Sequence, residues 1–204
     1  MRALLAAAAL VAATPGIHHT AAGMAAAKHA LVQRADLGAG WSVGVTPKKT
    51  GSLACKAPTS LKGIVETGAA ISPTYRAGAT GPFISASAFA YNSAASAAQY
   101  FVRVAKPQAL PCLVRTLEAE QPSTGVTFTI VKRQTLRPPS VPANAAAYRV
   151  VGRESVSAQK VTVYTDIVLL QRGSAIVELT IASFSSPLPA TTENRTVRAA
   201  AARL

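Results

Sequence analysis

The sequence predicts an α+β domain with an antiparallel β-sheet of about five or six strands, a helical layer on one face and a C-terminal helix. Three observations lead to this fold class. Segments with strand-like patterns outnumber helical ones, especially after residue 126. Short turns join consecutive strand segments, as in antiparallel hairpins. The 204 residues, half of them hydrophobic, suffice for one domain with a core.

The first 27 residues predict an export signal. Arg2 supplies a positive charge, and residues 3–14 form an apolar stretch that is too short to cross a bilayer. Small residues suited to signal cleavage follow at residues 21–27, and no cysteine for a lipid anchor lies near them. We therefore expect a secreted, extracytoplasmic protein with a signal peptide over residues 1–27 and a single domain over residues 28–204.

The first half of the domain is predicted to hold two main helices and one clear strand. A short helix is expected over residues 25–33. Residues 84–91 alternate in polarity and predict a strand. The next helix spans residues 94–106, behind an N-cap at Asn92 and Ser93. The apolar stripe of this helix consists of Ala97, Tyr100, Phe101 and Val104.

The two cysteines, Cys55 and Cys112, are expected to form a disulfide, because exported chains meet an oxidising environment. The bond would close a loop of about 58 residues and stabilise the fold by ~4 kcal/mol. Residues 46–83 are rich in Pro, Gly, Ser and Thr, and this composition predicts a long irregular loop, or excursion, from the domain. The disulfide would pin this excursion to a short helix over residues 111–120. The alternative is a pair of buried free thiols.

The second half is β-rich, with strands expected over residues 126–132, 146–151, 160–171 and 175–184. The last two strands predict a hairpin, whose register follows from the hydrophobic pattern. A three-residue loop, Arg172-Gly173-Ser174, with a left-handed glycine collects the best apolar residues on one face. These residues are Val163, Ile167, Leu169, Val177, Leu179 and Ile181. A final helix, begun by Thr191 or Thr192, is expected to end at Leu204.

Histidine-dependent chemistry is not expected in the folded domain. His18 and His19 lie in the predicted leader, and His29 lies just beyond it. A Ser-His-Asp or Cys-His mechanism would then lack its general base, and zinc would lack ligands. We therefore expect no catalytic residue of these types, no metal and no cofactor.

Carboxylates leave one enzymatic alternative open. In the predicted register, Asp166 and Glu178 lie on neighbouring strands and on the same face of the sheet. Such a pair, held at a suitable separation, is typical of glycoside hydrolases. Arg149 and Arg153 are candidate counter-charges, which would make the pair an ordinary polar part of the sheet. The alternative function is thus a carboxylate-dependent hydrolase of the cell envelope.

The charge balance is strongly basic, with 21 Lys and Arg against 8 Asp and Glu and a net charge of +13. The cations are dispersed and only 5% of residues are aromatic, so a nucleic-acid partner is not expected. Attraction to anionic envelope polymers or lipid surfaces fits better. The lone tryptophan, Trp41, follows a glycine turn and is expected to plug the core.

The layout of the chain resembles the actinobacterial extracellular sensor-domain family, the type found outside the membrane on PknH-like Ser/Thr kinases. The resemblance rests on the leader, the segment Ala35-Asp36-Leu37-Gly38-Ala39-Gly40-Trp41, the cysteine loop, the Ala-rich helix leading to Pro111-Cys112-Leu113, and the β-meander with its terminal Ala/Arg helix. It covers about residues 28–204. We expect this chain to depart from the kinases in having no kinase domain, no transmembrane anchor and only two cysteines. The resemblance implies a surface domain that binds a ligand or partner, and it carries over no functional residue.

The leading hypothesis is a non-enzymatic, sensor-like binding domain for an unknown small ligand or envelope component. Its groove is expected between the sheet and the helices, lined by Tyr100, Phe101 or Trp41, or beside residues 46–83. The alternatives are the Asp166–Glu178 hydrolase and a basic, envelope-associated structural protein.

Overall fold

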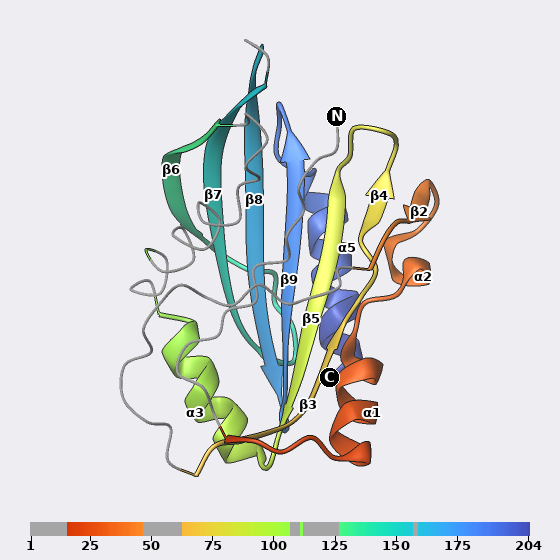
Figure 1. Cartoon of the computed structure of the whole chain (residues 1–204), viewed down its shortest axis with the longest axis vertical. Helices are drawn as coiled ribbons and strands as arrows, with labels where there is room; N and C mark the ends of the chain where they lie inside the picture. The colour runs from red at the N-terminus through yellow and green to blue at the C-terminus, as the bar shows by residue number, and fades with distance from the viewer. Residues whose placement is uncertain (1–15, 47–62, 107–110, 112–126, 157–158) are drawn as a thin grey trace.

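In the computed structural model, one large twisted sheet organises the chain (Figure 1). The structure describes residues 16–46, 63–106, 111, 127–156 and 159–204. Over these residues the sheet has nine strands, and its main path runs β1-β3-β5-β9-β8-β7-β6. The short β2 and β4 extend it beside β5. The strands are β1 (Gly16–Ile17), β2 (Trp41–Val43), β3 (Val65–Ile71), β4 (Tyr75–Ala77), β5 (Phe83–Tyr91), β6 (Thr127–Leu136), β7 (Asn144–Val156), β8 (Gln159–Arg172) and β9 (Ala175–Phe184).

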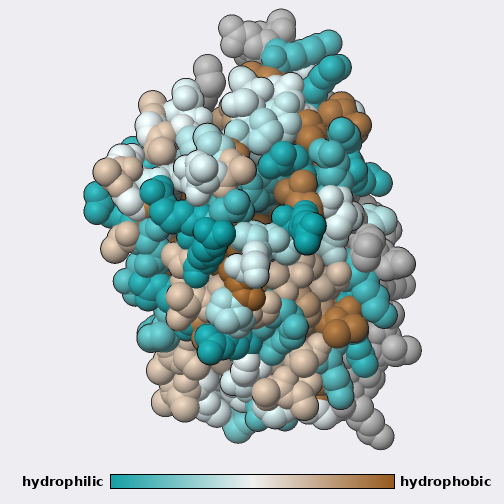
Figure 2. Space-filling view, turned by 180° about the vertical axis from the view of Figure 1, so that it is seen from behind, coloured by the Kyte–Doolittle hydropathy of each residue, from teal (hydrophilic) through white to brown (hydrophobic). Residues whose placement is uncertain are grey.

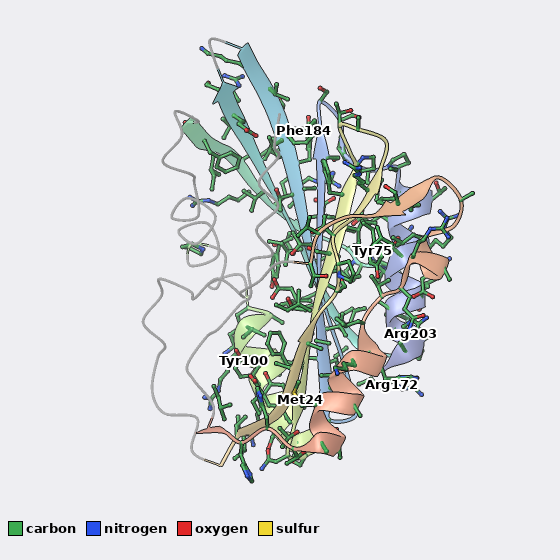
Figure 3. The ribbon with its side chains drawn as sticks, turned by 45° about the vertical axis from the view of Figure 1, so that its right-hand side comes forward. Met24, Tyr75, Tyr100, Arg172, Phe184 and Arg203 are labelled. Carbon is green, nitrogen blue, oxygen red and sulfur yellow. The ribbon has the colours of Figure 1, made fainter. Side chains whose placement is uncertain are left out.

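Helices lie on both faces of the sheet. The described helices are α1 (Ala21–Ala30), α2 (Arg34–Leu37), α3 (Ala94–Val104) and α5 (Ala190–Arg203). α1, α2 and α5 pack on one face and α3 packs on the other (Figures 1 and 3). The predicted α+β class, antiparallel sheet and C-terminal helix are confirmed. The strands number nine rather than five or six, and the helices are not confined to one face.

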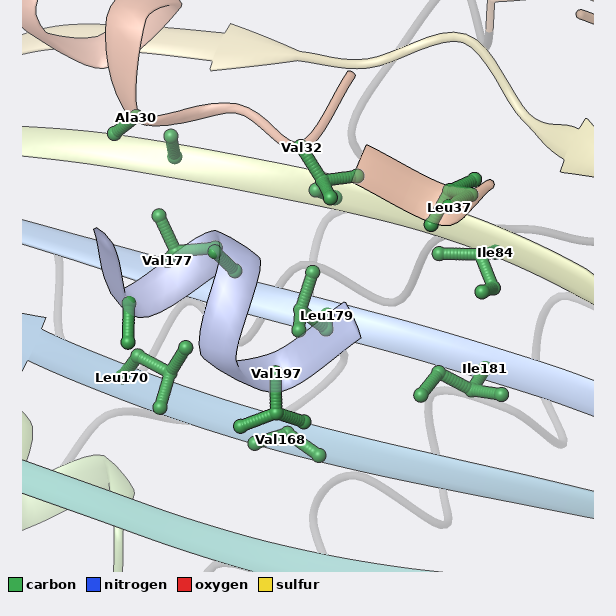
Figure 4. Packing of buried hydrophobic residues seen from close by; sticks show 14 of the residues in the cluster. Ala30, Val32, Leu37, Ile84, Val168, Leu170, Val177, Leu179, Ile181 and Val197 are labelled. Atoms are coloured by element: carbon green, nitrogen blue, oxygen red, sulfur yellow. The ribbon is translucent and has the colours of Figure 1, made fainter. Parts of the chain in front are cut away.

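The larger core lies under α1 and α5 (Figure 4). Alternate residues of β5, β9 and β8 face these helices. Because both the helices and the strands contribute aliphatic side chains, this face is almost wholly apolar. Its fully buried members include Val32, Leu37, Ile84, Val168, Leu170, Val177, Leu179, Ile181 and Val197.

α3 covers a smaller core on the opposite face. Ser93 caps the helix by accepting a hydrogen bond from the backbone N–H of Ser96, as its sequence predicts. All four residues of the predicted apolar stripe are buried, and Tyr100 and Phe101 lie among them. They pack against Tyr148, Ile167, Leu169 and Ile176.

The β8–β9 hairpin differs from its predicted register. Arg172 pairs with Ala175, so the loop has two residues, Gly173 and Ser174, rather than three. Gly173 has the expected positive φ of 55°. The prediction assumed one buried face, but α3 buries the second face as well. Both sets of apolar residues on these strands are therefore buried, and the pattern alone cannot select the register.

The segment 63–83 is more regular than predicted. β3 and β4 both lie within the stretch that the composition assigned to an irregular excursion. The rest of that stretch, residues 47–62, lies outside the described residues. So do both cysteines, and the Cys55–Cys112 disulfide stays a prediction.

α1 belongs to the folded domain, although most of it falls within the predicted leader. β1 pairs in parallel with β3, and the Gly23 backbone of α1 lies directly against the backbone of Thr67 and Gly68 in β3. Ala27 and Ala30 are buried. Signal removal stays a prediction, but cleavage after residue 27 would remove most of this packed helix.

We expect a chain that starts at Gly16 to fold and a chain that starts at Lys28 to be much less stable. The shorter chain loses β1 and the buried face of α1, which covers apolar residues of β5. Urea unfolding of the two purified chains checks this. Equal unfolding midpoints would show that residues 16–27 contribute nothing to the domain.

Candidate functional site

Five polar residues gather in the middle of the α3 face of the sheet. We call Ser85, Ser87, Thr165, Glu178 and Thr180 the polar cluster. The register pairs Ser87 with Glu178 and Ser85 with Thr180. On β8, Ile167 is the partner of Thr180, and Thr165 lies two residues from Ile167 on the same face. All five are buried, with exposed fractions from 1% to 7%. A sheet face of this depth is normally apolar, so the cluster requires a reason.

The hydroxyls of the polar cluster form no hydrogen bonds with the described part of the chain. Among the described residues, the side chains of Ser87, Thr165 and Thr180 have no hydrogen bond, and Ser85 Oγ is fully buried with no partner. Buried polar atoms of native proteins are hydrogen-bonded in the great majority of cases. The Ser85 hydroxyl is an exception to this rule, and the unpaired hydroxyls of Ser87, Thr165 and Thr180 lie beside it.

Several buried polar side chains elsewhere in the fold have partners, although Ser183, on the opposite face of the sheet, has no side-chain hydrogen bond to a described residue. Ser72 Oγ donates to the Pro73 carbonyl and accepts from the Ala86 N–H. Thr196 Oγ1 donates to the Thr192 carbonyl, and Gln171 donates to the Gly173 carbonyl. The polar cluster thus differs from these groups because its hydroxyls lack hydrogen-bond partners among the described residues.

Aromatic rings border the cluster at both ends of the face. At one end, Phe83 of β5 and Phe184 of β9 contact each other edge to face, with ring centroids 6.0 Å apart. Tyr91 and Tyr100 lie at the α3 end, with centroids 5.2 Å apart. Figure 3 shows Phe184 and Tyr100 far apart along the sheet. Pairs of aromatic rings thus lie at both ends of the polar cluster.

The tyrosines at the α3 end are uncharged donors and acceptors. Burial, and the neighbouring Tyr100 and Glu66, raise the pKa of Tyr91 well above its ordinary value. Burial also raises the pKa of Tyr148, whose hydroxyl donates to the Ala105 carbonyl just after α3. Both phenols therefore stay protonated at neutral pH and serve to hold α3 on the sheet.

The predicted Asp166–Glu178 pair does not exist. Asp166 lies opposite Ile181 and faces α5, whereas Glu178 lies opposite Leu169 and faces α3. The sheet separates the two carboxylates, so they cannot act on one bond. The error follows from the loop length, because one residue fewer in the turn moves all of β9 to the other face.

Asp166 instead forms a buried ion pair with Arg149. The guanidinium donates two hydrogen bonds, Nε to Oδ1 and Nη2 to Oδ2, each 2.6 Å long. Glu193 in the first turn of α5 lies 3.7 Å from the same guanidinium. Burial and Asp166 raise the pKa of Glu193, although Arg149 opposes them. Arg149 was one of the two predicted counter-charges, and its contacts tie α5 to the sheet.

A second ion pair lies at the C-terminal end of α5. Arg203 donates to both carboxylate oxygens of Asp36, which also accepts from the Gln33 N–H. Burial pushes the pKa of Asp36 up, but these hydrogen bonds outweigh it and lower the pKa. The contact joins α2 to the C-terminal helix and has a structural role.

Other predicted site residues fall outside the polar cluster. Trp41 is buried in the core under α1 and α5, as expected. His18, His19 and His29 all lie among the described residues of the fold, and whether His18 and His19 belong to a leader stays a prediction. They are exposed, and His19 Nε2 lies 2.8 Å from Glu66 Oε1. Within the described ranges, no three His, Cys, Asp or Glu residues come together as metal ligands.

Comparisons with known proteins add a fold likeness only. No protein-family model and no curated protein matches the sequence. The crystal structure of the extracellular domain of PknH from Mycobacterium tuberculosis matches 91% of this chain and 98% of its own, with a TM-score of 0.47 and 10% identity. That domain is of the type the sequence layout resembles. At this level of similarity the likeness does not bear on function.

No helix among the described residues is long and apolar enough to cross a membrane.

We expect Ser85→Ala to stabilise the protein when no ligand is bound. The substitution removes a buried hydroxyl without a partner, whose burial costs about 1 kcal/mol or more. Ser72→Ala is the matched control and should destabilise, because Ser72 Oγ is hydrogen-bonded on both sides. Urea unfolding of refolded protein checks both. A destabilised Ser85→Ala variant would contradict the availability of this hydroxyl.

Proposed function

We propose that this protein is a non-enzymatic, sensor-like binding domain that acts outside the cytoplasm. Its binding site is the polar cluster on the α3 face, and its ligand is a small molecule rich in hydroxyl or amide groups. The observation that carries the proposal is the fully buried, unpaired hydroxyl of Ser85, with the unpaired hydroxyls of Ser87, Thr165 and Thr180 beside it on the same buried face.

The chemistry of the cluster supports this ligand class. Serine and threonine hydroxyls both donate and accept, so they fit a ligand that does the same. Glu178 lies opposite Ser87 in the same cluster. The aromatic pair Phe83 and Phe184 offers apolar contact beside it, as sugar-like and peptide-like molecules require. Binding without chemistry fits best, because the carboxylate pair that a hydrolase would need is split across the sheet.

Native mass spectrometry tests the proposal. The mass of bound small molecule is measured on protein released from its own cell envelope and, for comparison, on refolded protein. The same measurement compares the wild type with Thr180→Val. Thr162→Val is the control, since Thr162 lies on β8 on the face away from the cluster. We expect a bound small molecule on the wild type and the control, and much less on Thr180→Val. Equal occupancy in all three, or none in the wild type, would refute the site.

A further inference from the structure

Three cations form a diagonal stripe on the part of the sheet that extends beyond α5. Lys132 of β6, Arg153 of β7 and Lys160 of β8 are all exposed, and we call them the cationic stripe. Lys132 pairs with Val151, and Lys160 pairs with Ser155. Each is therefore a diagonal neighbour of Arg153, roughly 7–8 Å away along the sheet. The three charges run across three strands on one face.

Acidic residues do not neutralise the cationic stripe. None of its members has an ion pair with a described residue. Glu154, the nearest described carboxylate along β7, follows Arg153 directly and so points to the opposite face. Asp166 and Glu193 both form ion pairs with Arg149. The stripe thus keeps three uncompensated positive charges in a chain of net charge +13.

The surroundings of the stripe are polar. Thr129 and Thr162 flank Arg153 on the neighbouring strands, and Ser155 faces Lys160. Figure 2 shows hydrophilic side chains at the upper end of this face, where the β7–β8 hairpin projects. Val131 is exposed, but it is a single residue beside the irregular register at Ile130 and Lys132. One isolated valine does not make an apolar patch.

We propose that the cationic stripe binds a linear anionic polymer through its repeating phosphate groups. Regularly spaced cations with intervening hydroxyls match a chain of phosphates, since lysine and arginine neutralise charge and hydroxyls donate to phosphate oxygens. A lipid bilayer fits less well, because membrane-surface elements pair cations with an apolar face. This surface is separate from the polar cluster, and its role does not depend on the proposed function.

Binding of fluorescent poly(glycerol phosphate) to the full chain tests this proposal. We expect affinity that falls with added salt, and a loss of about tenfold or more at low salt in the triple variant Lys132→Gln, Arg153→Gln, Lys160→Gln. The slope of log affinity against log salt should flatten by about 2. The matched control, Arg103→Gln, Lys106→Gln, Arg172→Gln, removes the same charge from exposed positions elsewhere and should lose less than about threefold.

Three results would overturn the proposal. Equal losses in the two triple variants would show that net charge alone drives binding. Stripe-dependent binding that is tighter to phosphatidylglycerol vesicles than to the polymer would assign the surface to a membrane. Absence of binding by the wild type at low salt would remove the site. Circular dichroism of both variants shows whether they are folded, and Lys132→Arg should retain the wild-type affinity.

Discussion

Replacing Gly68 with alanine is expected to lower the free energy of unfolding by about 3 kcal/mol or more. A Cβ atom at this position would lie 2.1 Å from the backbone carbon of Gly23 in α1. The contact is between two backbones, so no flexible side chain can move aside. Helix α1 would have to shift off β3, which would open the core around Ala27.

The control for this prediction is Gly16→Ala on the neighbouring strand β1. Its Cβ would lie 3.8 Å from Val65 Cγ2, an ordinary contact, and we expect a change within about 0.5 kcal/mol. Thermal and urea unfolding of the two variants give the comparison. Similar, small effects for both would mean that α1 does not pack closely on β3.

Replacing Arg149 with methionine is expected to cost about 3–5 kcal/mol of stability at neutral pH. Asp166, whose side chain is only 2% exposed, would then be a buried charge without its partner. The double variant Arg149→Met, Asp166→Leu should recover most of the loss, because no charge remains buried. A double variant as unstable as the single one would contradict the ion-pair explanation.

Lowering the pH should reduce the difference in the free energy of unfolding between Arg149→Met and the wild type. The wild type already holds the pKa of Glu193 above its ordinary value through burial and Asp166, with Arg149 opposing. Without the guanidinium, that pKa rises further in the folded state. A carboxyl group whose pKa is raised in the folded state lowers the free energy of unfolding when the pH is above that pKa. This loss disappears as the pH falls and the group becomes protonated. Urea unfolding between neutral and mildly acidic pH measures the effect.

The sequence predicted those parts of the fold that depend on local patterns. The span of β9 and the capped helix α3 follow from periodicity and capping residues, which act within a few positions. The final helix α5 was also predicted, but its predicted cap was wrong: the helix begins at Ala190 behind Pro189, without a side-chain cap, and not behind Thr191 or Thr192. β3 and β4 were missed because Gly68 and the polar residues around it look like loop residues. These residues become a strand through pairing with β5, which lies far along the chain.

The candidate site was only partly visible in the sequence. Ser85 and Ser87 alternate with Ala86 and Ala88, so two polar residues on one face of a strand could be predicted. Their alignment with Thr180 and Glu178 depends on the β5–β9 register, a long-range contact. The predicted hairpin loop, one residue too long, placed Glu178 on the face of Asp166 instead.

The most direct test of the binding site is the unfolding free energy of a variant without the four hydroxyls. This variant carries Ser85→Ala, Ser87→Ala, Thr165→Val and Thr180→Val and is compared with refolded wild type, free of small molecules. If the hydroxyls are kept for a ligand, the variant is as stable as the wild type or more stable. A loss of about 2 kcal/mol or more would show that the hydroxyls support the fold and would contradict the binding site.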